Sequence, residues 1–159
     1  MKKAIPNLVR CLICVMMLSL VVMEIFWTPR VTEYALSFVS DESYENIIRM
    51  SAYISSTLIL LLSLTVCLIS FKFATCFKND TVFTPSTAKD IKIVACLVSV
   101  DCLILAFVSI TLFFIGDGIL APALAFFDII GIAIASTLFV LSRYLKEAAE
   151  LKEEVDCTL

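Results

Sequence analysis

Residues 50–71 have the sequence MSAYISSTLILLLSLTVCLISF, which contains no charged side chain. At 1.5 Å per residue, a helix of this length would cross the roughly 30 Å of hydrocarbon in a bilayer. Three further stretches have similar length and apolarity: residues 5–27, 93–116 and 119–142. The sequence therefore predicts an all-α membrane protein, a four-transmembrane-helix bundle in which residues 1–159 form a single integral membrane domain.

The composition supports this fold and excludes several classes of protein. Hydrophobic residues make up 61% of the chain and charged residues only 17%, whereas soluble domains are close to half apolar and a quarter charged. A soluble enzyme, a secreted disulfide scaffold, a disordered tail and a nucleic-acid-binding module are all excluded on this ground. We expect the lipid bilayer to be the main surrounding of the chain, and no direct binding of nucleic acid.

A cleaved signal peptide is the alternative for the first apolar stretch, since Lys2 and Lys3 precede it. Cleavage requires small residues after the apolar run, and EIFW stands there at residues 24–27. We therefore expect an uncleaved span, with the Arg10 side chain reaching inward and Trp27 at the outer interface.

The distribution of basic residues predicts the orientation. The loop after the first span, residues 28–49, has only Arg30 and Arg49, and the Gly116-Asp117-Gly118 turn after the third span has none. Lys and Arg concentrate on the cytoplasmic side, so both termini are expected to be cytoplasmic, in the inner membrane of a bacterium. Ten of the twelve basic residues lie in the segments predicted to be inside: Lys2, Lys3, Arg10, Lys72, Lys78, Lys89, Lys92, Arg143, Lys146 and Lys152.

Enzymatic chemistry has little support in the residue types present. The chain has no histidine, which removes Ser-His and Cys-His nucleophilic pairs and the usual zinc ligand sets. Cys11 and Cys14 have redox spacing but lie within the first span, where packing is the commoner role for cysteine. We expect no enzymatic activity, no metal and no cofactor.

Acidic residues inside the predicted spans are the most informative candidates. A charged acid at the centre of a spanning helix costs about 2.5–3.5 kcal/mol, so each should face protein or water. Either they form a proton- or cation-responsive centre, or they are neutral and hydrogen-bond between helices. Stripes of small residues on the spans would bring serine hydroxyls close to them. The intramembrane polar candidates are Asp101, Asp128, Glu24, Ser63 and Ser99.

The polar end of the chain forms a second candidate site. Residues 143–159 predict a short cytoplasmic amphipathic helix that continues the fourth span. This helix is either a solvated end or a docking surface for a cytoplasmic partner. The docking candidates on its apolar side are Tyr144, Leu145, Ala148, Leu151 and Val155.

Two segments carry a resemblance to a known family. The inner loop has KNDTVF at residues 78–83, followed by Thr84 and Pro85, a pair typical of a helix start. The chain ends with LKEAAELKEEVDCTL at residues 145–159. With four spans at this length, these segments resemble a bacterial membrane family called domain of unknown function 2975, over nearly the whole chain. The ending differs from the family pattern at Val155, where the family tends to carry Asn.

The resemblance implies no activity and no site residues. Members of the family often accompany a small helix-turn-helix repressor-like protein, which implies a regulatory pairing. Two functions are therefore kept open. The first is a non-enzymatic regulatory or sensory membrane protein that presents its inner loop and C-terminal helix to a cytoplasmic partner, such as a helix-turn-helix regulator. The second is a small ion- or proton-coupled transporter, assembled as a homo-oligomer, that uses the intramembrane carboxylates.

Overall fold

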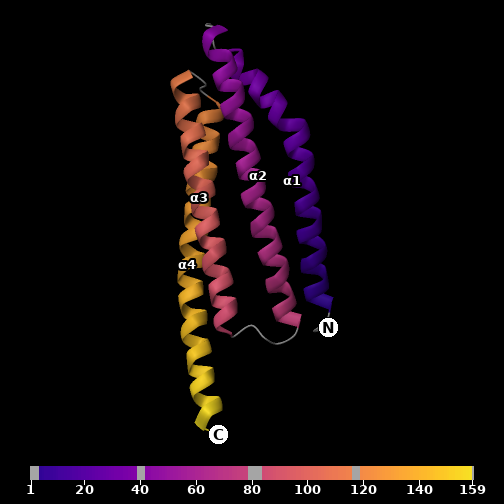
Figure 1. Ribbon diagram of the computed structural model, residues 1–159, viewed down its shortest axis with the longest axis vertical. Helices are drawn as coiled ribbons and strands as arrows, with labels where there is room; N and C mark the ends of the chain where they lie inside the picture. Colours follow the sequence, from indigo (N-terminus) through magenta and orange to yellow (C-terminus); the bar gives the residue numbers. More distant parts are fainter. Residues whose placement is uncertain (1–3, 39–41, 79–83, 116–118, 159) are drawn as a thin grey trace.

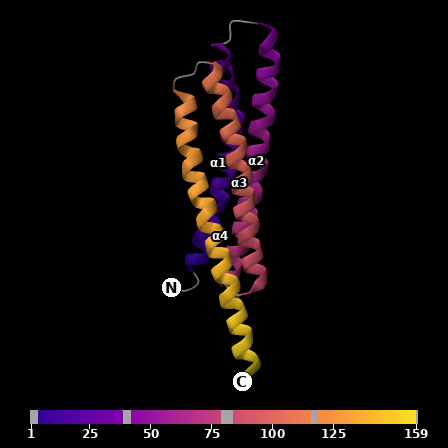
Figure 2. The same cartoon turned by 90° about the vertical axis from the view of Figure 1, so that its left-hand side faces the viewer.

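Four long helices account for nearly all of the chain. The computed structural model describes residues 4–38, 42–78, 84–115 and 119–158. The helices lie side by side in an elongated bundle (Figures 1 and 2). One end of the bundle, the terminal end, holds the start of α1 and the end of α4; at the opposite hairpin end, α1 is followed by α2 and α3 by α4 (Figure 1). Their bounds are α1 Ala4–Leu36, α2 Glu42–Lys78, α3 Pro85–Ile115 and α4 Leu120–Thr158.

Each helix is long and apolar enough to cross a membrane, so the prediction of an all-α, four-span fold is confirmed. The segments that meet this criterion are Asn7–Leu36, Glu45–Cys76, Pro85–Phe114 and Leu120–Val155. Large apolar side chains such as Leu18, Leu103, Phe114 and Phe127 are exposed on the outside of the bundle. Such a surface is unfavourable in water and matches a hydrocarbon surrounding.

The helices extend well beyond the predicted spans. Much of residues 28–49, expected as an outer loop, is helical, because α1 continues to Leu36 and α2 begins at Glu42. A span is limited by the thickness of the hydrocarbon, whereas a helix continues wherever its backbone hydrogen bonds persist. Pro29 lies inside α1 and cannot donate to the carbonyl of Ile25. Beyond this region α1 leans toward α2 (Figure 1).

The C-terminal segment continues the fourth span as predicted, but the prediction of a short helix is wrong. Residues 143–158 are the continuation of one long helix, α4. The reason is local: the segment contains no Gly or Pro, is rich in Ala, Leu, Lys and Glu, and forms pairs four residues apart. The Arg143 and Glu147 side chains lie 3.2 Å apart, and those of Lys146 and Glu150 lie 3.4 Å apart.

Thr84 caps α3 as expected. Its hydroxyl accepts a hydrogen bond from the backbone N–H of Thr87 at 3.3 Å, and Pro85 is the first residue of the helix, where a missing N–H costs nothing. The other predicted turns, in the loop at residues 79–83 and at residues 116–118, lie outside the described residues.

The bundle consists of two helix pairs joined near both ends. The closest packing is between α3 and α4, followed by that between α1 and α2. At the hairpin end, Ala35 of α1 is buried with Leu112 and Ala121 of the other pair. At the terminal end, the Nζ of Lys72 in α2 lies 2.6 Å from a carboxylate oxygen of Asp90 in α3. Small side chains at the first junction allow the helix backbones to approach closely.

The basic residue in the first span also contacts α2. A guanidinium nitrogen of Arg10 donates to the hydroxyl of Thr75 at 2.8 Å, and the guanidinium lies over the ring of Phe71, 5.4 Å from its centre. Arg10 lies near the terminal end, where α1 begins, so these contacts attach the start of α1 to α2.

Candidate functional site

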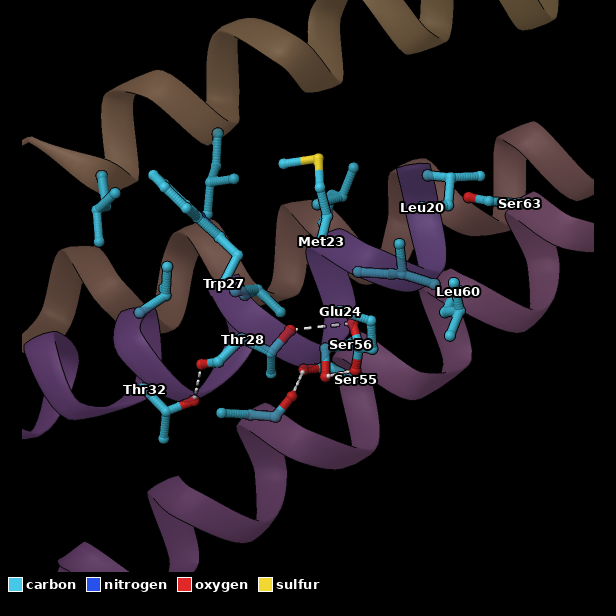
Figure 3. A pocket seen from close by; sticks show the side chains of 17 residues that line it. Leu20, Met23, Glu24, Trp27, Thr28, Thr32, Ser55, Ser56, Leu60 and Ser63 are labelled. Carbon is cyan, nitrogen blue, oxygen red and sulfur yellow. Dashed lines mark hydrogen bonds between the residues drawn. The ribbon is translucent and has the colours of Figure 1, made fainter. Parts of the chain in front are cut away.

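Glu24 lies at the interface of α1 and α2, hydrogen-bonded on both of its carboxyl oxygens. The hydroxyl of Ser56 in α2 donates to Oε1 at 2.8 Å, and the hydroxyl of Thr28, one turn further along α1, donates to Oε2 at 3.0 Å. Figure 3 shows the three side chains gathered where the two helices meet. Among the described residues, Glu24 forms no ion pair.

A cavity of about 340 Å³ opens beside this carboxyl group. It has walls from all four helices: Leu20, Met23, Glu24, Trp27, Thr28, Val31, Thr32, Ala52, Ser55, Ser56, Ile59, Leu60, Ser63, Leu105, Val108, Leu120 and Leu124. Most of this surface is apolar; the polar side chains other than Ser63 lie near the carboxyl group (Figure 3). We call it the Glu24 pocket.

Asp101 contacts the far end of the same pocket through a serine. The hydroxyl of Ser63, which lines the Glu24 pocket, lies 3.4 Å from Oδ2 of Asp101. The other carboxyl oxygen, Oδ1, is buried and has no hydrogen-bond partner in the described part of the chain. The structure thus brings Ser63 and Asp101 together between α2 and α3.

Asp128 lies apart from the other two acids, between α3 and α4. Its side chain is 9% exposed, and its Oδ1 is buried without a hydrogen-bond partner among the described residues. Cys102 and Ser99 line a cavity together with Asp128. The Cys102 sulfur fills the space over Gly131, since a Cβ added at that glycine would lie 2.6 Å from it. The hydroxyl of Ser99 is directed to its own helix, bonding the carbonyl of Ala95 at 2.8 Å.

The predicted acids therefore lie at three different helix interfaces, and Ser63 joins Asp101 to the Glu24 pocket. Glu24 lies between α1 and α2, Asp101 between α2 and α3, and Asp128 between α3 and α4. Two partners of Glu24, Thr28 and Ser56, were not among the candidates. The i, i+4 spacing to Thr28 was visible in the sequence, whereas contact with Ser56 depends on the register of two helices. Within the described residues, no three His, Cys, Asp or Glu side chains gather as a metal site would require.

The predicted docking side chains of α4 divide between two faces. Tyr144, Leu151 and Val155 are exposed, the first two by 65% and 62%. Leu145 is only 9% exposed and packs with Ala88 and Ile91 of α3, so it belongs to the interior. Ala148 is half-buried at the boundary. An amphipathic pattern alone could not separate the face that packs on α3 from the face that remains open.

The arrangement of these helices defines the class of protein: a helical multi-pass membrane protein with four spans and acidic side chains between them. The chain belongs to the family described as Protein of unknown function (DUF2975), whose model matches residues 3–159. The predicted resemblance is confirmed over essentially the whole chain. Comparison with curated proteins and with solved structures finds no match.

Proposed function

We propose that the protein is a non-enzymatic regulatory or sensory protein of the bacterial cytoplasmic membrane, with both termini in the cytoplasm. In this proposal, the end of α4 binds a small cytoplasmic DNA-binding regulator. One observation carries it: α4 continues past the other helices at the terminal end (Figure 2). Residues 150–155 are exposed on every face of the helix, although two of them, Leu151 and Val155, are apolar.

The orientation of this projecting segment supports the proposal. Leu145 and Ala149 are buried, and Leu145 packs on α3, which fixes the rotation of the helix just before it leaves the bundle. Tyr144, Leu151 and Val155, spaced by seven and four residues, share another face. Because that face is apolar and directed away from the bundle, it suits insertion into a groove of a partner protein.

Crosslinking from two opposite faces of α4 tests the proposal. A photoreactive amino acid replaces Leu151 in one variant and Glu153 in the control, since two residues are about 200° apart around a helix. We expect the variant at Leu151 to capture one soluble DNA-binding protein in cells, and the variant at Glu153 to capture none. Truncation after Tyr144 should abolish co-purification of the same DNA-binding protein while leaving membrane insertion intact. Equal capture from both faces, or capture of the protein itself alone, would contradict the proposal.

A small proton-coupled transporter, assembled as a homo-oligomer, is the second candidate. The observation that favours it is the pair of carboxyl oxygens on Asp101 and Asp128 that are buried without hydrogen-bond partners among the described residues. Acids in such surroundings are costly and often mark ion or proton pathways. Self-crosslinking of α4 would be the expected outcome under this candidate.

A further inference from the structure

The Glu24 pocket combines a carboxyl group with an apolar cavity of a size that suits a small molecule. Its volume of about 340 Å³ falls within the roughly 300–1,000 Å³ usual for ligand sites. The walls are mostly aliphatic, and all of the polar side chains except Ser63 lie where α1 meets α2; Ser63 lies at the far end of the pocket (Figure 3). A ligand that fits both the apolar and the polar part of the pocket has an apolar body and one polar group.

The charge of that polar group follows from what surrounds Glu24. The Ser56 and Thr28 hydroxyls supply hydrogen bonds to both carboxyl oxygens but no positive charge. Among the described residues no Lys or Arg lines the pocket; Arg30 lines a neighbouring cavity that shares Trp27 with it. An unpaired carboxylate next to apolar walls is strongly stabilised by a cation.

An aromatic side chain next to the carboxyl group adds to this preference. Trp27 lies one turn along α1 from Glu24 and lines the same pocket (Figure 3). The face of an indole ring attracts cations, and more strongly than the ring of Tyr or Phe. Trp27 and Met23 are both exposed, so they border the open side of the pocket and leave a route for entry.

We propose that the Glu24 pocket binds an amphipathic organic cation, with an ammonium group at the Glu24 carboxylate and an apolar body among the side chains of all four helices. This site is independent of the docking surface on α4, and its test does not depend on any cytoplasmic partner.

The test uses the full chain in dodecyl maltoside, an uncharged detergent, with benzyltrimethylammonium as the probe. Trp27 is the only tryptophan and lines the pocket, so its fluorescence reports binding directly. Equilibrium dialysis of radiolabelled probe provides a second readout that does not depend on Trp27. Neopentylbenzene, in which a carbon replaces the nitrogen, is the uncharged probe of matching shape.

We expect saturable binding of benzyltrimethylammonium and no saturable response to neopentylbenzene. Glu24→Gln should weaken binding roughly tenfold or more, because it removes the charge while keeping the shape. Glu33→Gln is the matched control: it alters an exposed acid of the same helix that lies outside the pocket, and it should bind like the wild type.

A second variant separates loss of the site from loss of the fold. Ser55 lines the pocket, but its hydroxyl donates to the carbonyl of Ala52 in its own helix and not to Glu24. Ser55→Leu therefore fills the cavity while leaving Glu24 and its two hydroxyl partners in place, and it should also abolish binding. Unaltered binding in either Glu24→Gln or Ser55→Leu, or equal binding of the uncharged probe, would overturn the proposal. An absence of saturable binding to the wild type would also overturn it.

Discussion

Gly131 allows α3 and α4 to pack closely, because its side chain is a hydrogen rather than a methyl group. A Cβ added at this glycine would lie 2.6 Å from the Cys102 sulfur, too close for ordinary contact. We expect Gly131→Ala to destabilise the protein by about 1–3 kcal/mol, since overpacking outweighs the gain in helix propensity. Thermal unfolding in detergent measures this change.

In a Cys102→Ala background, we expect the same substitution to stabilise the protein instead of destabilising it. With the sulfur absent, Gly131→Ala retains only the propensity gain of about 1 kcal/mol and should raise the unfolding temperature. Equal effects of Gly131→Ala in both backgrounds would show that the sulfur is not the obstacle.

Substitutions of Asp101 and Asp128 test the second candidate function, a proton-coupled transporter. Asparagine keeps the shape of each side chain but cannot exchange a proton. If the protein is a proton-coupled transporter, Asp101→Asn and Asp128→Asn should each slow the collapse of an imposed pH gradient in proteoliposomes to the protein-free rate. Helix content and elution volume should be unchanged, because both side chains lie within helices that pack through other residues. A wild type no faster than empty liposomes would rule out proton movement, and unaltered variants would leave both acids with a purely structural role.

The individual helices could be predicted from the sequence far better than their ends. Charge-free stretches such as residues 50–71 identify a span because hydrocarbon excludes charge. The same criterion locates spans and not helix ends: α1 continues past Trp27 and α4 past Ser142, since Glu, Lys and Arg favour helix once the chain has left the hydrocarbon. At the start of α3, Thr84 and Pro85 carry a local chemical signal, and that boundary was predicted correctly.

The arrangement of the candidate site could not be predicted from the periodicity of the sequence. Glu24, Asp101 and Asp128 stood out in the sequence because each is an acid in an apolar stretch. Their positions at three different helix interfaces depend on which helices are neighbours and on how far each helix is shifted along its axis relative to the next. Contact between Glu24 and Ser56 joins residues 32 positions apart, and no local rule specifies such a pair.

At the scale of the whole molecule, the direction of the bundle across the membrane is the property that the proposed function needs most. The start of α1, the end of α2, the start of α3 and the end of α4 share the terminal end (Figure 1). Lys72, Lys89, Lys92, Arg143 and Lys146 belong to these helix ends. Because basic residues are retained on the cytoplasmic side, we expect the terminal end to be inside the cell and the hairpin end outside.

Labelling of two introduced cysteines tests this orientation directly. Ser37 lies just after α1 at the hairpin end, and Lys152 lies near the end of α4; both are exposed. We expect Ser37→Cys to react with a membrane-impermeant maleimide in intact cells, and Lys152→Cys to react only after permeabilisation. The parent protein, whose cysteines are predicted to lie in spans or inside the cell, is the control for background labelling. The reverse pattern would place α4 outside, where no cytoplasmic regulator could reach Leu151 or Val155, and would remove the basis of the proposed function while leaving the Glu24 pocket unaffected.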